Sequence, residues 1–394
     1  MKALISQLHT ELSRQNFSYW SINSAPRCRI VEFAARRVRL IGVLWRQFYR
    51  IMPVNLRRLF TDDEAGVNLQ ARIILGFAYL HLQGMYGDKT YRESFDLCIS
   101  SVVESGYEEE GHFSIRQSNR LFLLSYEADT SDVSPLLTCW AGWLFLKIFQ
   151  KNNRSEYLKM AESVANYFVN AHPKDICGPE EVYFRYVPTL SEEIFNCSAM
   201  ISAFLVEFGN TVGNRLYEDL GIRGLKHVIG AQNPDGSWFY GRSRRFRYVD
   251  NFHTAFVLTA LCMARSHYGP GRLEAALDRG LSFYRRHLFK RINPKELRPV
   301  HFLKRYPPIN SNIIQQVDLR DAASAMILFS CLGKTGEYVK DADDVLRWTL
   351  KYMRLSSGFS PEITWFWRNK IPYIEYQAYM FLAIVLYYRK ITRG

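Results

Sequence analysis

Four stretches of the chain combine carboxylates, histidines or amides with aromatic residues, and each comes just before or at the start of an apolar run. They cover residues 183–196, 235–253, 301–321 and 365–376. Paired carboxylates serve as general acid and base in inverting hydrolysis, and in lyase or epimerase reactions that remove a proton beside a uronate. The same chemistry recurring at four similar positions points to acid–base work on a polar substrate.

Asp250 is the best-placed candidate for the principal acid or base. His253 follows three residues later, so on a helix it would lie on the same face and could share or orient the proton. The second acid would be Asp321 or Glu375. The alternative is structural: Asp250 would be a helix N-cap, and His253 a buried histidine bonded to a backbone carbonyl.

The aromatic and amide residues of these stretches suit a carbohydrate. Aromatic faces stack on the C–H faces of sugar rings, while carboxylates and amides hydrogen-bond the hydroxyls. Alternatively, these rings close the ends of a large core. The candidate substrate-binding residues are Tyr186, Glu193, Trp238, Tyr240, Asp318, Trp367, Asn369, Tyr373 and Tyr376.

Helical patterns that alternate with polar breaks would position these residues. The first helix of each pair is apolar nearly all round, as over 255–263, and is expected to be buried. The second has one charged face, as over 272–281, and should lie outside. The expected pairs are 66–84 with 88–104, 133–150 with 155–171, 191–209 with 213–231, 250–267 with 271–288, and 318–332 with 339–354, followed by a last helix over 373–390.

An inner ring of apolar helices inside an outer ring of amphipathic helices is an alpha/alpha toroid. The predicted fold class is therefore all-α, with about six helical hairpins and almost no strand signal of period two. The loops that lead into the inner helices would converge on one funnel. We divide the chain into a basic amphipathic segment, 1–60, and a toroid domain, 61–394. The first of these is a candidate for the missing outer helix, which would give six pairs or a partial ring.

The formal charge of +13 is concentrated near the N-terminus, where residues 27–58 hold nine arginines and the single acid Glu32. Interleaved apolar residues make this composition typical of a helix on an anionic membrane or an acidic partner. Alternatively, the apolar face packs on the toroid and the arginines are solvated. A nucleic-acid partner is not expected, because no recognised nucleic-acid-binding motif accompanies the basic stripe.

Several protein classes lack support. No secretory signal pattern and no uncharged apolar run of about 18 residues occurs, so neither export nor a spanning helix is expected. The seven cysteines include no C-x-x-C pair and suggest core positions in a reducing compartment. Without H-E-x-x-H, a His/Cys cluster or G-x-S-x-G, no metal and no cofactor are expected. The predicted location is cytoplasmic, peripheral at the inner face of the cytoplasmic membrane.

Two motifs resemble those of class II terpene cyclases, which are themselves alpha/alpha toroids. Gln232, Gly236 and Trp238 resemble a QW motif, and the acids over 341–344 resemble D-x-D-D. The second motif opens an amphipathic outer helix, where acids favour the positive end of the helix dipole. A cyclase would instead need a closed apolar cavity reached by Asp343.

The segments 236–241, 250–258 and 369–373 resemble an uncharacterised family of bacterial exopolysaccharide and capsule polysaccharide biosynthesis proteins. That family is similar in fold to six-hairpin glycosidases and to the helical domain of glucuronyl C5-epimerases. The resemblance implies a role in surface polysaccharide assembly, with an oligo- or polysaccharide, free or lipid-linked, as partner. The positions carried over by motif are Trp238, Asp250, His253, Asp318, Asn369 and Tyr373.

The chain departs from that family at two places. Residues 318–321 read Asp-Leu-Arg-Asp where an Asp-x-His-Ser type of element is expected, and Glu375 stands where a basic residue is expected. The leading hypothesis is a glycan hydrolase, lyase or epimerase that uses Asp250. The departures keep open a different substrate, or a non-catalytic glycan-binding or scaffold protein.

Overall fold

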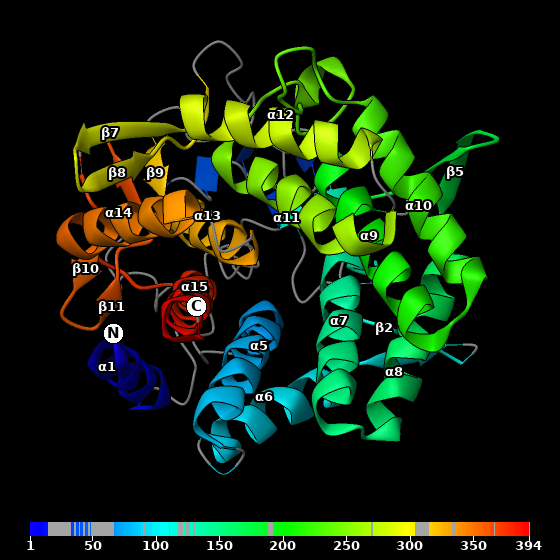
Figure 1. The fold of residues 1–394 in the computed structure, drawn as a ribbon, viewed down its shortest axis with the longest axis horizontal. Helices are drawn as coiled ribbons and strands as arrows, with labels where there is room; N and C mark the ends of the chain where they lie inside the picture. The colour runs from blue at the N-terminus through cyan, green and yellow to red at the C-terminus, as the bar shows by residue number, and fades with distance from the viewer. Residues whose placement is uncertain are drawn as a thin grey trace.

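The structure is a computed structural model of the chain. It describes residues 1–14, 67–87, 91–109, 111–116, 131–187, 192–268, 271–303, 315–332, 336–365 and 367–393, with isolated residues between them. The basic segment 27–58 lies outside these ranges apart from scattered positions. The helices form two concentric rings (Figure 1).

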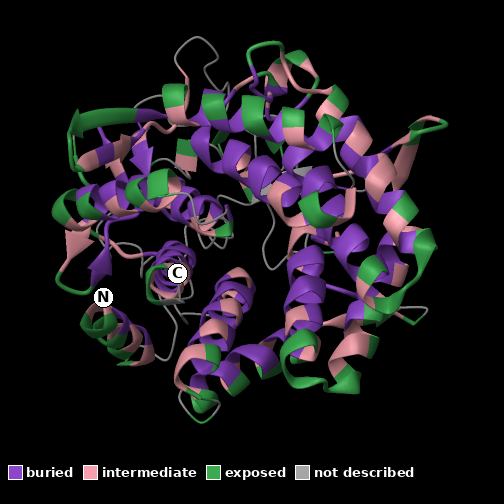
Figure 2. Cartoon of the chain, in the orientation of Figure 1, coloured by how far each residue is buried: buried purple, intermediate pink, exposed green. Residues whose placement is uncertain are grey.

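Six helices form the inner ring in the described part of the chain. Most of their side chains are apolar or small, and these helices are buried along most of their length (Figure 2). Each contacts the next, and the last returns to the first, which closes the ring. In order, they are α5 (Leu69–Tyr86), α7 (Pro135–Asn152), α9 (Phe195–Val212), α11 (Asn251–Tyr268), α13 (Leu319–Cys331) and α15 (Ile374–Arg393).

The outer helices are amphipathic, with exposed residues toward solvent and buried residues toward the inner ring (Figure 2). In α12, for example, Leu273, Leu277 and Leu281 are buried, while Arg286 is exposed. Five outer helices follow their inner partners: α6 (Arg92–Glu104), α8 (Ser155–Asn166), α10 (Arg215–Gly230), α12 (Arg272–His287) and α14 (Gly336–Tyr352). A π-helical turn, Tyr167–Ala171, continues α8.

The beginning of the chain supplies a further outer helix, α1 (Lys2–Arg14). Its buried face of Ile5, Leu8 and Leu12 joins the main core, and the helix lies beside α15 (Figure 1). Glu11 forms an ion pair with Arg354 at 2.8 Å. With α1 as the partner of α15, the described helices make six hairpins, as expected for an alpha/alpha toroid.

Short antiparallel strand pairs occupy several connections between helices. Most are local hairpins, but β9 pairs with the distant β12, with Asp318 opposite Glu362, and this pairing fixes the start of α13. The pairs are β1 (Tyr107–Glu109) with β2 (His112–Ser114), β3 (Leu121–Phe122) with β4 (Glu127–Ala128), β5 (Lys174–Gly178) with β6 (Glu181–Phe184), β7 (Phe289–Asn293) with β8 (Glu296–Pro299), β10 (Arg354–Leu355) with β11 (Gly358–Phe359), and β9 (Gln315–Asp318) with β12 (Glu362–Thr364).

The cysteines occupy mixed environments rather than only the core. Cys98, Cys139 and Cys197 are buried, but Cys177 and Cys331 are exposed. Among the described residues, no helix is both long and apolar enough to cross a bilayer.

Candidate functional site

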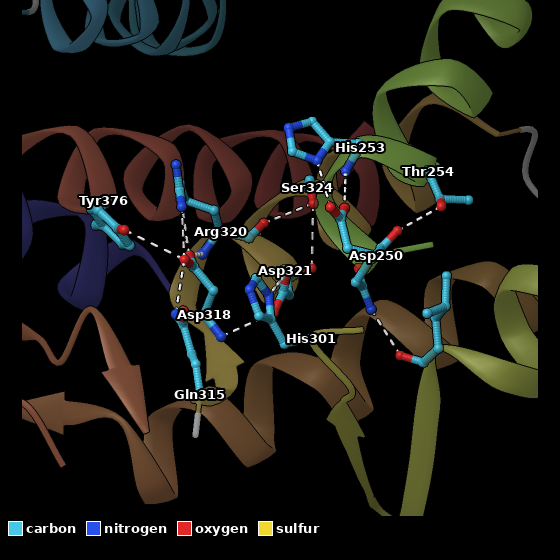
Figure 3. Close-up of polar contacts among 12 residues, drawn as sticks. Asp250, His253, Thr254, His301, Gln315, Asp318, Arg320, Asp321, Ser324 and Tyr376 are labelled. Carbon is cyan, nitrogen blue, oxygen red and sulfur yellow. Dashed lines mark hydrogen bonds and ion pairs between the residues drawn. The ribbon is translucent and has the colours of Figure 1, made fainter. Parts of the chain in front are cut away.

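The N-terminal ends of the inner helices form one face of the ring, which we call the N-terminal face. A cluster of acids and bases in contact with one another lies at the starts of α11 and α13 (Figure 3). Closure of the ring places these two helix starts next to each other, because α11 packs against α13. An isolated bridge between Asp250 and Phe302 ties the same region to the segment that leads toward α13.

Asp250 immediately precedes α11 and holds His253 by two hydrogen bonds. One carboxylate oxygen accepts the backbone N–H of His253 at 2.7 Å, as an N-cap does, and the other lies 2.6 Å from its Nδ1. Burial raises the pKa of Asp250, but the nearby His253 and His301 outweigh it and leave the pKa below its usual value. Asp250 is therefore both the helix cap and the partner of the histidine.

The other ring nitrogen of His253, Nε2, points away from Asp250 (Figure 3). The His253 side chain is 28% exposed, whereas that of Asp250 is 7% exposed. No hydrogen bond to Nε2 is formed by the described residues. Asn251 ties the start of α11 to the end of α12, because its amide donates to the Leu288 carbonyl at 2.7 Å and accepts from the Tyr284 hydroxyl at 2.6 Å.

The start of α13 carries a capping box made by Asp318 and Asp321. The Asp318 carboxylate accepts the backbone N–H of Arg320, and the Asp321 carboxylate accepts that of Asp318, both at 2.9 Å. Asp318 also accepts two hydrogen bonds from the Arg320 guanidinium, at 2.9 and 2.8 Å. Burial opposes ionisation of Asp318, but Arg320 outweighs it and lowers the pKa to about 2. Asp318 is thus a buried carboxylate that Arg320 keeps ionised at neutral pH.

Asp321 lies fully buried against His301, whose Nδ1 is 3.0 and 3.2 Å from its two carboxylate oxygens. Burial raises the pKa of Asp321 to about 6, with a further contribution from the charge of Asp318. Burial lowers the pKa of His301, but the attraction of Asp321 is stronger and raises it to about 9. Near neutral pH the two form a buried ion pair.

A cavity of about 10 Å³ adjoins the Asp250–His253 pair. This is about the space that one water molecule needs. The side-chain oxygen of Asn196, from the first turn of α9, is buried and has no hydrogen-bond partner among the described residues. A water or a sugar hydroxyl placed here would satisfy it. The lining residues are Asn196, Trp238, Phe239, Tyr240, Asp250, His253, Thr254 and Val257.

Two of the aromatic candidates near this pair are enclosed by protein. Trp238 is 2% exposed, its indole N–H donates to the Val228 carbonyl at 2.8 Å, and its ring abuts Gly280 of α12. The tryptophan of the QW-like motif is therefore a packing residue, and its ring is not open to a sugar. Tyr240 is 9% exposed and packs against His253, with ring centroids 4.4 Å apart. Its role toward the histidine is support from one side.

The candidates around the start of α15 are also buried. Tyr373 and Tyr376 are 1% and 2% exposed, and the Tyr376 hydroxyl donates to Asp318 at 3.4 Å. Asn369 is 5% exposed and donates to a Glu362 carboxylate oxygen at 3.3 Å. Glu375 accepts from the Asn68 amide at 3.3 Å, which joins α15 to α5 instead of to the Asp250 pair. These residues hold the N-terminal face together.

Other candidates keep some access to solvent. Glu193 is 23% exposed in its side chain but engaged by His227 at 2.8 Å and Arg242 at 2.6 Å. Tyr186 is half-buried, and Trp367 is 37% exposed. Trp367 follows β12, which pairs with the strand leading into Asp318. Tyr186 and Trp367 are therefore more exposed to solvent than the other predicted aromatic residues.

A layer of aromatic rings lies between this polar cluster and the centre of the ring of helices. Phe252 packs on Phe256 and Tyr379, with centroids 4.6 and 5.6 Å apart, and Trp140 packs on Phe256 at 5.5 Å. The Arg320 guanidinium lies over the Phe252 ring at 4.7 Å on the polar side. The layer separates the buried charges from the centre of the ring.

The acids over 341–344 lie in the outer ring. Asp341 pairs with Arg285 at 2.7 Å and Asp344 with Arg291 at 2.7 Å, and both contacts join α14 to its outer neighbours. Asp343 is 32% exposed in its side chain and pairs with Arg347. A cyclase acid would have to point into the ring, so this position of Asp343 removes the basis of the terpene cyclase hypothesis. Among the described residues, no group of three or more His, Cys, Asp or Glu side chains could hold a metal ion.

Comparisons with known proteins agree with this architecture. No protein-family model and no curated protein matches the chain. Similar solved structures include the GH76 α-mannanase of Bacteroides thetaiotaomicron, with 10% identity and a TM-score of 0.61 over 83% of this chain and 88% of that one. Others are a cellobiose 2-epimerase of Spirochaeta thermophila, with 11% identity and a TM-score of 0.56 over 82% and 86%, and a possible GH105 member of Salmonella enterica, with 14% identity and a TM-score of 0.56 over 83% and 84%. At these identities the likeness establishes the fold, the six-hairpin alpha/alpha toroid.

Proposed function

We propose that this protein is a glycan-modifying enzyme that transfers a proton at the N-terminal face of its ring. The observation that carries the proposal is the Asp250–His253 pair. A buried carboxylate fixes Nδ1 of the imidazole at 2.6 Å, and Nε2 is directed away from it on a part-exposed side chain. This is how a histidine general base is oriented. We therefore assign the base to His253, and to Asp250 the orienting role.

The state of the carboxylates favours an epimerase or lyase over a hydrolase. Two-carboxylate hydrolysis needs one carboxylate on each side of the scissile bond. Here Asp250 is engaged by His253, Asp318 by Arg320 and Asp321 by His301. Removal of a proton beside a carbonyl or uronate instead needs one base and nearby positive charge for the developing anion. The Arg320 guanidinium pairs with Asp318 through two of its five donors and is 26% exposed in its side chain, so its other donors could contact such an anion.

Proton NMR in deuterated water tests this proposal. The protein would be incubated with cellobiose, manno-oligosaccharides and a uronate-containing polysaccharide, and loss of ring-proton signals, unsaturated products and new reducing ends would be followed together. Loss of a ring-proton signal, or an unsaturated product, with at least one saccharide is expected. His253→Gln should reduce the rate by about 10²- to 10⁴-fold, the usual contribution of a general base.

Two further variants sharpen the test. Asp250→Asn keeps an N-cap side chain, so the helix start should persist while the tautomer and charge of the pair change. His287→Gln, on the exposed side of α12, is the matched control and should leave the rate unchanged. Full activity of His253→Gln would overturn its assignment as the base. If the NMR signals of one glycan broaden in a saturable way but no product forms, the protein would instead be identified as a glycan-binding protein.

We further propose that the substrate belongs to surface polysaccharide assembly, and that the protein is cytoplasmic and peripheral at the inner face of the membrane. The support for the membrane contact comes from the scattered described positions of the basic segment. Phe33, Leu40, Leu44 and Phe48 are each more than half exposed, which suits insertion into an anionic interface. Co-sedimentation with anionic vesicles at low salt, but not with zwitterionic ones, is expected. No co-sedimentation with either would rule the membrane contact out.

A further inference from the structure

The centre of the ring holds a second, much larger space that the polar cluster does not use. This cavity has a volume of about 520 Å³, within the usual range of about 300 to 1,000 Å³ for small-molecule sites. All six inner helices line it, mostly with apolar or aromatic side chains. Representative lining residues are Ile74, Trp143, Met200, Met263, Leu382 and Leu386.

The cavity starts at the aromatic layer and extends toward the C-terminal ends of the inner helices. Trp140, Phe256 and Tyr379, from the second turn of their helices, line its inner end. On α15 the lining residues continue from Tyr379 to Lys390. The eleven helical steps between these two residues correspond to a depth of about 16 Å at the rise of an α-helix. The space is therefore long and apolar, with its closed end against the layer under His253.

Positive charge gathers at the other end. Lys147, Arg389 and Lys390 line the cavity at this end, which we call its mouth. Among the described residues, Glu207 pairs with Lys147. Lys390 directs two hydrogen bonds to the carbonyls of Ser330 and Leu332, at 3.4 and 2.8 Å. An ammonium has three donors, so one has no partner among the described residues and could bind a ligand.

Arg389, the second cation at the mouth of the cavity, also has donors without a partner among the described residues. Arg389 contacts Nδ1 of His81 at 2.9 Å through one nitrogen, and a guanidinium carries five donors. In part these cations offset the negative ends of the helix dipoles that meet at this face. Capping alone, however, does not account for an apolar space of this size beneath them.

We propose that the central cavity binds a single-chain amphiphile whose hydrocarbon tail fills the space and whose anionic headgroup lies against Arg389, Lys390 and Lys147. The tail matches the apolar lining, since burial of apolar surface is the main favourable term. The headgroup matches the excess of cations at the mouth. Alkyl or prenyl phosphates and fatty carboxylates share this chemistry. The site is separate from the His253 face and does not depend on the proposed proton transfer.

Isothermal titration calorimetry on the full chain tests this site, with every amphiphile kept below its micelle concentration. Dodecyl phosphate and dodecanoate would distinguish the two anion classes, dodecyltrimethylammonium carries the same chain with the opposite charge, and inorganic phosphate carries the headgroup alone. At least one anionic amphiphile should bind with one-to-one stoichiometry. The cationic amphiphile should bind much more weakly, and phosphate alone should show no heat.

Variants place the binding in the cavity. Thr259 lines it at mid-depth, so Thr259→Trp should fill the space and abolish binding. Thr392→Trp, at an exposed position of the same end of α15, is the matched control. Arg389→Gln should weaken binding of the anionic amphiphile by roughly tenfold, which is the effect of losing one hydrogen bond to a charged group. The variant should not change the midpoint of unfolding.

A third readout is independent of heat. Cys331 lines the mouth, so bound amphiphile should slow its alkylation while that of Cys177, exposed on β5, is unaffected. Equal binding of the anionic and cationic amphiphiles, unchanged binding by Thr259→Trp, or no binding at all would each overturn the proposal. Loss of binding in Thr259→Trp with full glycan turnover would support it, and would also separate this site from the one at His253.

Discussion

The buried His301–Asp321 pair should make the stability of the protein depend on pH in the alkaline range. The pKa of His301 is raised to about 9 in the folded state, against about 6.5 in an unfolded chain. A histidine with a raised folded pKa contributes its full stabilisation below about pH 6.5, and loses it as the pH rises through about 9. The difference of about 2.5 units corresponds to about 3 kcal/mol, since each unit is worth about 1.36 kcal/mol.

The reference protein for this measurement should lack both titrating groups. Removing His301 alone would leave the fully buried Asp321 carboxylate without its cation, which is strongly destabilising and shifts a second titration into the same window. The double variant His301→Asn, Asp321→Asn keeps hydrogen-bonding groups at both positions and removes both charges. Asp321, with a pKa of about 6, is already mostly ionised at pH 6.5 and adds little above it.

The assay is urea unfolding at pH 6.5 and pH 9.5, followed by far-ultraviolet circular dichroism. The free energy of unfolding of the natural protein should fall by about 3 kcal/mol more than that of the double variant between these two values. Lysines and tyrosines elsewhere titrate in both proteins and cancel in the comparison. An equal fall in the two proteins would refute the assignment of His301 as a buried cation at neutral pH.

Two other predictions separate support from binding. Arg320→Met should cost about 3 to 5 kcal/mol in urea unfolding, because it leaves the buried Asp318 charge unpaired, whereas Arg347→Met, which breaks an exposed pair of α14, should cost under about 1 kcal/mol. Trp238→Ala should destabilise by about 3 to 5 kcal/mol, as for other buried aromatic residues. Trp367→Ala should leave stability unchanged and weaken glycan binding in NMR titrations, and the opposite pattern for the two tryptophans would contradict their placement.

Much of the fold is predictable from the sequence because burial on every side leaves a simple signature. The segment 255–263 is apolar in all directions, and only a helix inside another ring can bury it so completely. The outer partner over 272–281 carries the complementary pattern of one charged face. The short strands were not predicted, because pairs of two to five residues have no measurable period. The pairing of β9 with β12 also joins segments far apart in the chain.

The site could be predicted only where its contacts are local. Asp250 caps the helix on which His253 lies three residues later, so their contact follows from spacing alone. His301 meets Asp321 across twenty residues and a strand, and no periodicity relates them. Arg320 is a partial exception. Its pairing with Asp318 is local, at a spacing of two residues, but its burial over an aromatic layer depends on the whole ring.

The aromatic layer explains why similar residues on one face hold protons so differently. Asp318 and Asp321 start the same helix and are both buried, yet their pKa values are about 2 and about 6. With water excluded from below by Phe252 and its neighbours, each charge is governed by the partner in direct contact. Arg320 binds Asp318 through two hydrogen bonds and keeps it ionised. Asp321 instead pairs with one histidine, His301, and lies near the negative charge of Asp318. Asp321 is thus expected to protonate before Asp318 as the pH falls below neutral.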